Sequence, residues 1–251
     1  MVFSIASADT LDRNKSYFAR VVVMTYLWLK ARIALTASLL LMRAHWSYPM
    51  NILHINSSIL DGSSGSRAIS AAIVARMQSL HPGSSVIYRN LIEDAPMHLS
   101  DRHWAAVQGA SVTDAALSAD LALGATYLEE LFAADIIVIG APMYNFTIPS
   151  QLKAWLDRVV VAGKSFKYDE NGVEGLVTGK KTYIASSRGG YYLGDSPMAS
   201  LDHQETYLLG MLGFIGLTDT TVIRVEGVNY GPEIKAAELA KALVEVAALA
   251  A

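Results

Sequence analysis

Cysteine is missing from this chain of 251 residues. Its absence excludes disulfides, thiolate metal sites and a cysteine nucleophile, and it fits a protein of the reducing cytoplasm. The six histidines are scattered, with no HxxxH or HxH spacing that would indicate a local metal site. The sequence therefore predicts a cytoplasmic protein without a metal centre.

Runs of positive charge are missing as well. The 20 lysines and arginines are outnumbered by 23 aspartates and glutamates, which gives a formal net charge of −3. A weakly acidic chain gains nothing from the phosphate backbone of DNA or RNA. Nucleic acid is therefore not expected as a partner.

The first fifty residues also lack an apolar run long enough to span a bilayer. The runs at 21–29 and 33–42 are separated by Lys30-Ala31-Arg32. A span needs roughly 20 apolar residues, and two cations near the membrane centre would cost about 2.5–3.5 kcal/mol each. Acidic residues precede the apolar part, whereas a signal peptide begins with cations. A membrane anchor or targeting signal is therefore the less favoured alternative, and no membrane partner is expected.

Residues 1–49 are interpreted instead as a poorly defined N-terminal extension, or as an upstream stretch included through a wrong start codon. A methionine, Met50, stands directly before the first strand-like run. The folded domain is therefore expected to occupy residues 50–251.

After Met50, strand-like runs alternate with helical patterns. Strands are predicted at 51–56, 85–88, 135–140, 181–186 and 220–225, and helices at 69–80, 150–161, 203–214 and 233–250. The run at 135–140 is apolar almost throughout, which is typical of a central parallel strand covered on both faces. The pattern predicts an α/β domain with a doubly wound, five-stranded parallel sheet and helices on both faces.

Ligands of such sheets bind at the carboxyl ends of the strands. The loop after the first strand, residues 57–66, is rich in serine and runs into a helix. Hydroxyls, backbone N–H groups and the positive end of the helix dipole suit a phosphate monoester. The alternative is an ordinary turn in which Ser66 caps the helix. No Walker pattern and no GxGxxG follows this strand, so a nucleoside triphosphate or a tightly bound dinucleotide is not indicated.

The loop after the third strand, residues 141–149, has proline at positions 142 and 149. Between them, Tyr144 and Phe146 could line an apolar slot for a flat ring, and Asn145 offers a donor and an acceptor to a heterocycle edge. The alternative is that both aromatic rings pack under the loop.

The loop after the fourth strand contains Gly189 and Gly190. Paired glycines allow the backbone to approach a ligand closely, so their N–H groups could face the edge of a flavin. Arg188 could add positive charge there or form a surface ion pair.

Taken together, several stretches resemble the FMN-dependent NADH azoreductases, also described as NADH:quinone oxidoreductases, which have the flavodoxin-like fold. The matching stretches are Ser57-Ser58-Ile59-Leu60, Ala141-Pro142-Met143-Tyr144-Asn145-Phe146, Gly175-Leu176-Val177-Thr178-Gly179-Lys180-Lys181, Ser187-Arg188-Gly189-Gly190 and Leu212-Gly213-Phe214-Ile215-Gly216. They occur in order from Met50 nearly to the end of the chain. The segment Tyr191-Tyr192-Leu193-Gly194-Asp195 varies within the family, which leaves acceptor preference open.

The resemblance implies a flavoprotein with bound FMN, transient NADH or NADPH as donor, and a quinone or azo compound as acceptor. It implies a homodimer with the flavin near the subunit interface. The implied cofactor-binding residues are Ser58, Ser64, Gly65 and Ser66 at the phosphate, Met143, Tyr144, Asn145 and Phe146 at the isoalloxazine and ribityl chain, and Ser187, Arg188, Gly189 and Gly190 at the pyrimidine edge.

The expected mechanism is a two-electron ping-pong hydride transfer, in which donor and acceptor use one flavin face in turn. The flavin carries the redox chemistry, so no catalytic side chain is required. Tyr144, Tyr168 or Tyr191 could donate a proton to the acceptor, and each equally suits a wall of the site.

Two other functions are less favoured. A flavodoxin-type electron carrier would bind FMN without turning over a small molecule, but such carriers are usually strongly acidic. A serine hydrolase would need a GxSxG elbow, and Gly62-Ser63-Ser64-Gly65-Ser66 lacks the final glycine.

Overall fold

The computed structural model describes residues 30, 32, 49–170 and 172–250. The chain divides into two units, residues 1–47 and 48–251, and the sheet with its flanking helices lies in the second. The interpretation of residues 1–49 as an extension falls almost wholly outside the described residues and stays a prediction.

Five parallel strands form one sheet in the order β2-β1-β3-β6-β7. The strands are β1 (Asn51–Asn56), β2 (Ser85–Asn90), β3 (Ile136–Pro142), β6 (Lys181–Ser187) and β7 (Asp219–Val225). Every residue of β3 is buried, as expected for an apolar strand in the middle of a covered sheet. The strand order is that of the flavodoxin-like fold, which confirms the predicted doubly wound parallel sheet.

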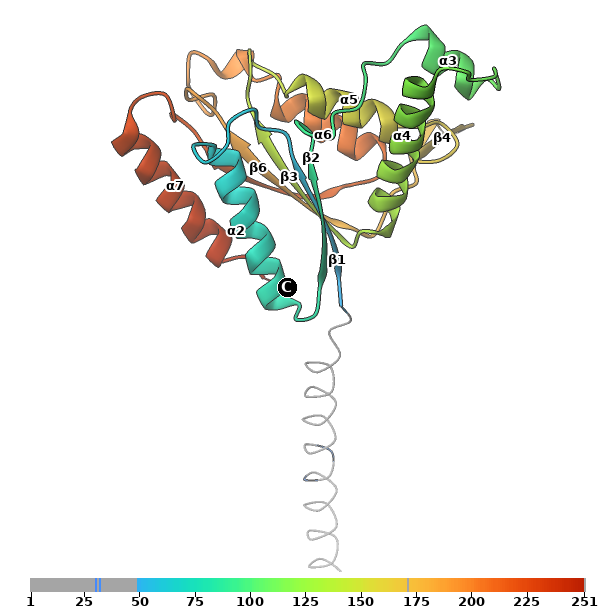
Figure 1. Ribbon diagram of the computed structural model, residues 1–251. Coiled ribbons are helices and arrows are strands. Elements are labelled where there is room, and N and C mark those ends of the chain that lie inside the picture. The colour runs from blue at the N-terminus through green and yellow to red at the C-terminus, as the bar shows by residue number, and fades with distance from the viewer. Residues whose placement is uncertain (1–29, 31, 33–48, 171, 251) are drawn as a thin grey trace, which may run out of the picture. The chain divides into compact units, whose positions relative to one another are not determined.

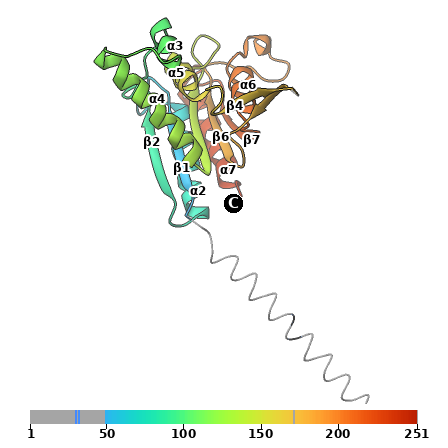
Figure 2. The same cartoon turned by 90° about the vertical axis from the view of Figure 1, so that its right-hand side faces the viewer.

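Helices cover both faces of this sheet (Figure 1 and Figure 2). On one face lie α2 (Gly65–Leu80) and α7 (Pro232–Ala247); on the other lie α4 (Ala115–Ala133), α5 (Ser150–Val159) and α6 (Glu205–Phe214). The sequence patterns did not predict α4, the short helix α3 (Asp101–Val107) or the antiparallel hairpin of β4 (Phe166–Asp169) and β5 (Gly172–Gly175).

The alternation of side chains along β1 shows how one strand contributes to two cores. Ile52 is buried with Ile73 of α2, whereas the next residue, Leu53, is buried on the opposite face with Trp155 of α5. Fully burying such a side chain contributes roughly 1.5–3 kcal/mol to folding. Both faces of the sheet are therefore held by apolar packing.

The sheet register brings three strand ends to one edge. Asn56 of β1 pairs with Gly140 of β3, and Pro142 of β3 pairs with Ser187 of β6. The three loops singled out in the sequence therefore leave the sheet side by side.

In the part of the chain that the structure describes, no helix has the length and apolar character needed to cross a membrane. Nor do the described residues group three His, Cys, Asp or Glu side chains where a metal ion could bind.

Candidate functional site

Hydrogen bonds tie the three loops at the carboxyl edge of the sheet to one another. The Ser57 hydroxyl donates to the carbonyl of Gly140 at 2.7 Å, and the Met143 N–H donates to the carbonyl of Ser187 at 2.8 Å. A Cβ atom on Gly65 would lie only 2.8 Å from the Ser187 hydroxyl oxygen. Glycine is therefore needed where the first turn of α2 packs against the end of β6.

The serine loop presents the N-terminus of α2. Ser64, not Ser66, is the N-cap: its backbone is extended, and its hydroxyl accepts a hydrogen bond from the Arg67 N–H at 3.2 Å. The interpretation of Ser66 as the cap was wrong by two residues, because the helix already begins at Gly65. Both serines are buried, and their hydroxyl oxygens lie 3.2 Å apart. Two hydroxyls thus converge with the N–H groups of Gly65 and Ser66, which have no acceptor among the described residues, as an anion site requires.

Ser58 and Tyr144 connect the serine loop to the loop after β3. The Tyr144 phenol oxygen lies 3.3 Å from the Ser58 hydroxyl oxygen and accepts a hydrogen bond from the Ile59 N–H at 3.1 Å. Ser58 is fully buried, and its hydroxyl also accepts from the Leu60 N–H at 3.1 Å. Tyr144 therefore does not pack under its own loop. Its hydroxyl instead forms hydrogen bonds with the serine loop.

Residues 144–147 form a tight turn with an uncommon backbone. Tyr144 and Thr147 exchange two backbone hydrogen bonds, of 2.9 and 3.2 Å. The two central residues, Asn145 and Phe146, have φ angles of 49° and 69°. Asparagine tolerates this left-handed region, whereas a residue such as phenylalanine pays roughly 1–2 kcal/mol there. The turn exposes both side chains at the site, and strain of this kind is typical of functional loops.

The Arg188 side chain is turned into the interior of the protein. Its side chain is fully buried and forms ion pairs with Asp202 at 3.0 Å, Glu226 at 3.1 Å and Glu205. These carboxylates neutralise the guanidinium, so Arg188 supports the loop from below and is not the surface ion pair considered as an alternative. Glu226 also accepts a hydrogen bond from the Tyr192 N–H at 2.8 Å, which ties the loop to the end of β7.

The two glycines after Arg188 use their carbonyls and their N–H groups differently. The carbonyls of Gly189 and Gly190 accept hydrogen bonds from the N–H groups of Asn229 and Gly227. A Cβ on Gly189 would lie 2.4 Å from the side-chain nitrogen of Asn229, so a larger residue here would have to displace the Asn229 side chain. Among the described residues, neither glycine N–H has a hydrogen-bond acceptor. This pair of donors is available to a ligand.

Two cations lie beside the serine loop that the sequence patterns did not single out. Lys235, in the first turns of α7, donates its amine to the Ser63 carbonyl at 2.5 Å. Arg67 donates to the Ser58 carbonyl at 2.9 Å, and its buried Nε has no partner in the described part of the chain. Beside them is a shallow cavity of about 390 Å³ lined by Asp61, Gly62, Ser64, Arg67 and Ala68. No local motif marks Lys235, because only the fold brings α7 to this loop, whereas Arg67 directly follows the serine loop in the sequence.

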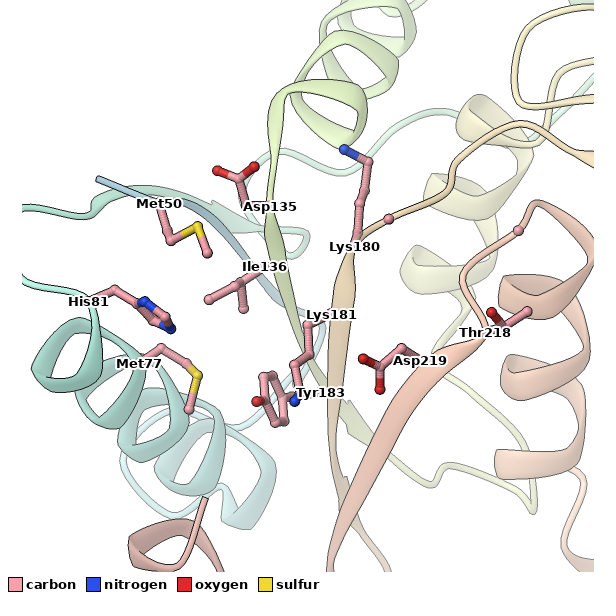
Figure 3. Close-up of a pocket in the computed structure, with 12 residues that line it drawn as sticks. Met50, Met77, His81, Asp135, Ile136, Lys180, Lys181, Tyr183, Thr218 and Asp219 are labelled. Atoms are coloured by element: carbon pink, nitrogen blue, oxygen red, sulfur yellow. The ribbon is translucent and has the colours of Figure 1, made fainter. Parts of the chain in front are cut away.

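A larger cavity, of about 480 Å³, lies at the opposite edge of the sheet (Figure 3). Two of its charged groups have structural partners: the Lys180 amine donates to the carbonyls of Phe132 and Ala134, and the Asp135 carboxylate accepts from the Asn51 N–H. Burial lowers the pKa of Lys180. The helix ends at this edge are C-terminal, which disfavours a phosphate. The candidate cofactor site is therefore the edge formed by the three loops.

The folded domain is similar to known proteins in sequence and in structure. A family model described as flavodoxin-like fold matches residues 50–250. The chain is 51% identical over 202 residues to FMN-dependent NADH:quinone oxidoreductase 2 of Bradyrhizobium diazoefficiens, covering 80% of this chain and all of that protein. It is 49% identical to FMN-dependent NADH:quinone oxidoreductase of Rhizobium meliloti, over 77% of this chain and 93% of the relative.

A solved structure is similar as well. The azoreductase of Bacillus anthracis strain Sterne superposes with a TM-score of 0.70 at 27% identity, covering 79% of this chain and 97% of that protein.

Proposed function

The chain belongs to the flavodoxin-like family and, within it, to the FMN-dependent NADH:quinone oxidoreductases, and from this we propose that it binds FMN and uses it to pass electrons from NADH to quinones and azo compounds. The observation that carries the proposal is the meeting of three loops whose free donors suit different parts of FMN. The relatives from Bradyrhizobium diazoefficiens and Rhizobium meliloti are named as FMN-dependent NADH:quinone oxidoreductases, and about half of the aligned positions are identical to this chain.

The residues present fit the phosphate end of FMN. Ser64, Ser66 and the N-terminus of α2 supply hydroxyl and N–H donors, and Gly65 keeps the backbone close to β6. Ser58 is buried behind them, and its hydroxyl already bonds within the two loops. We therefore assign direct contact to the first two serines and a supporting role to Ser58.

The other two loops fit the ring. The turn of Met143, Tyr144, Asn145 and Phe146 exposes an amide that makes no hydrogen bond within the described residues, next to a half-exposed aromatic ring. The free N–H groups of Gly189 and Gly190 would bond to the oxygen-bearing pyrimidine edge, while Ser187 and Arg188 position them.

When bound, FMN supplies the two-electron redox chemistry, which no side chain of this protein can supply. The chain holds the ring, orients it, and leaves one face open for donor and acceptor in turn. We therefore extend the proposal to ping-pong kinetics. Plots of the reciprocal initial rate against the reciprocal NADH concentration, at several quinone concentrations, should give parallel lines. Intersecting lines would contradict a shared site.

The visible spectrum of the purified protein tests the cofactor directly. We expect a yellow protein whose released flavin chromatographs as FMN, and a colourless protein that neither FMN nor FAD reconstitutes would overturn the proposal. Oxidation of NADH with a simple quinone then separates the enzyme from a flavodoxin-type carrier, because a carrier would show flavin but no turnover. The same assay with NADPH decides the preferred donor.

The proposal includes a homodimer, supported by exposed apolar side chains. Leu99, Trp104 and Val107, in and beside α3, are 55%, 66% and 66% exposed. Side chains of this size seldom gather on the surface of a monomer. Light scattering after size-exclusion chromatography should give twice the chain mass, and a monomeric mass at micromolar concentration would contradict it.

We also propose a cytoplasmic location, because NADH, the donor named for the relatives, is kept inside the cell. Cell fractionation tests this location.

We propose further that the folded domain starts at Met50, and that residues 1–49 are either an extension or an upstream stretch included through a wrong start codon. The intact mass of the native protein separates these two possibilities, because a mass that includes residues 1–49 would rule out a wrong start codon.

A further inference from the structure

Two exposed tyrosine rings stack at the rim of the candidate site. The ring centroids of Tyr191 and Tyr230 are 5.6 Å apart, and the ring planes differ by 14°. Tyr191 is 42% exposed and Tyr230 is 61% exposed. Offset stacking attracts the two rings to each other but leaves a broad aromatic surface in water. Tyr191 directly follows Gly190, so this surface is continuous with the loop whose N–H groups are free.

The backbone beneath the two rings is held in place. Three hydrogen bonds join the loop after β7 to the glycine loop: Gly227 to Gly190 at 3.0 Å, Val228 to Arg188 at 3.1 Å and Asn229 to Gly189 at 3.1 Å. Each runs from the N–H of the first residue to the carbonyl of the second. The stacked pair is therefore fixed relative to the glycine loop, and ordering it for a ligand costs little entropy.

Gly227 provides the seat for Tyr191. A Cβ atom at this position would lie 2.7 Å from Cζ and 2.8 Å from the hydroxyl of Tyr191, and the φ angle of 67° also favours glycine. Any larger residue would displace the ring. Stacking on Tyr230 and close packing against Gly227 thus both hold the Tyr191 ring in one orientation.

The next residue, Tyr192, behaves differently. Its ring packs edge-to-face on Phe146 at 6.3 Å, and its N–H is bound by Glu226. In contrast, the hydroxyls of Tyr191 and Tyr230 form no hydrogen bond with another described residue. Tyr192 therefore joins two loops of the site, whereas the stacked pair offers flat faces and two free hydroxyls to a ligand.

We propose that Tyr191 and Tyr230 form an aromatic platform that binds the planar aromatic ring of a substrate beside the flavin. The proposal rests on the proposed function, because it assigns the substrate-binding rim of that same site. A planar ring occurs both in an aromatic acceptor and in the nicotinamide dinucleotide donor.

Calorimetric titrations of the oxidised, FMN-loaded protein test the platform. Anthraquinone-2-sulfonate represents the acceptor and NAD⁺ the donor, in separate titrations. Tyr191→Leu and Tyr230→Leu remove a ring from exposed positions, and Tyr191→Phe keeps the ring as the matched control. We expect each Leu variant to bind one probe about five- to tenfold more weakly, with Tyr191→Phe within about twofold of wild type. The probe that is weakened identifies the source of the ring.

Turnover gives a second readout. If the platform binds the acceptor, KM for the aromatic acceptor should rise by a similar factor in the Leu variants, while the rate with ferricyanide, which has no ring to stack, stays at the wild-type value. If it binds the donor, KM for NADH should rise with either acceptor. Unchanged affinity for both probes would overturn the platform. So would a wild-type protein that binds neither probe, or Leu variants that become monomeric with unchanged probe affinity, since the rings would then be a contact between copies.

Flavin content separates this proposal from the one on which it rests. If wild-type protein holds no flavin, the proposed function fails, and the same titrations on the flavin-free protein still decide the platform. If the Leu variants retain FMN as wild type does and bind both probes unchanged, only the platform fails.

Discussion

The phenol oxygen of Tyr144 lies 3.3 Å from the hydroxyl oxygen of Ser58, although the two residues are 86 positions apart in the chain. The same phenol accepts a hydrogen bond from the Ile59 N–H. One side chain from the loop after β3 thus sets the shape of the serine loop after β1. The parts of the site proposed to bind the ring and the phosphate are therefore joined through Tyr144.

Tyr144→Phe should therefore weaken FMN binding without unfolding the protein. The change removes bonds worth about 0.5–1.5 kcal/mol each, so we expect the Kd for FMN to rise about three- to tenfold. Quenching of FMN fluorescence on titration into flavin-free protein measures it. The control is Tyr183→Phe, which removes a hydroxyl at the opposite edge of the sheet. Equal affinity in both variants would show that the bridge does not shape the site.

Because the backbone at Asn145 is left-handed, two substitutions are needed to separate the loss of its amide from backbone strain. Asn145→Ala removes the amide and also strains a residue with φ of 49°, at a cost of roughly 1 kcal/mol. Asn145→Gly removes the amide but suits the turn. We expect both variants to retain less FMN or be reduced more slowly by NADH, and only the alanine variant to lose stability in urea. Wild-type flavin content and rate in the glycine variant would remove Asn145 from the site.

The close approach of Gly189 to Asn229 predicts a rescue. Gly189→Ala places a Cβ where the Asn229 side-chain nitrogen lies, 2.4 Å away, and should destabilise the loop by about 1–3 kcal/mol. Adding Asn229→Ala removes the obstructing group. FMN affinity and the urea midpoint should both fall in the single variant and recover in the double variant. Strictly additive effects would mean that the clash is not the cause.

His54 should make the fold sensitive to mild acid. Burial and, next, the positive charge of Arg67 lower the pKa of His54 to about 4. In the unfolded chain the pKa of a histidine is near 6.5, so between pH 6.5 and pH 4 the unfolded chain binds a proton at His54 that the folded protein does not bind. The resulting stability, about 3 kcal/mol, is fully present above pH 6.5 and is lost as the pH falls towards 4.

Urea unfolding at pH 7.5, 5.5 and 4.5 measures this effect. His54→Gln keeps a polar partner for the Ser70 hydroxyl, 2.9 Å from the ring, but cannot titrate, so its stability should change less with pH than that of wild type. The control is His98→Gln at an exposed position. The same pH dependence in His54→Gln and wild type would exclude His54 as the source.

The predicted strands and most of the helices came from local patterns. The run at 135–140 predicted a buried central strand, and β3 is that strand; the helix expected at 150–161 is α5, two residues shorter. The helix expected at 69–80 begins four residues earlier, because the first turn of α2 is formed by small polar residues that carry no apolar periodicity. α3 and the β4–β5 hairpin are short, and short elements give weak periodic signals.

The site was harder to predict residue by residue. The sequence pointed to Arg188 as a possible contact of the flavin, but Asp202, Glu205 and Glu226 surround its guanidinium. All three come from later in the chain, so no local pattern could show that the charge is neutralised. The same holds for Lys235, which reaches the serine loop from α7 across 172 positions.

The sequence by itself determined the alternation of strands and helices, and hence the edge of the sheet at which the loops gather, because both depend on local periodicity and on the parallel direction of the strands. Only the tertiary structure decided which polar groups remain free there. It turned Arg188 inward, tied Tyr144 to Ser58, and left the N–H groups of Gly189 and Gly190 without acceptors among the described residues. Whether a donor is free depends on partners supplied by distant segments, and the packing of the whole domain sets those partners.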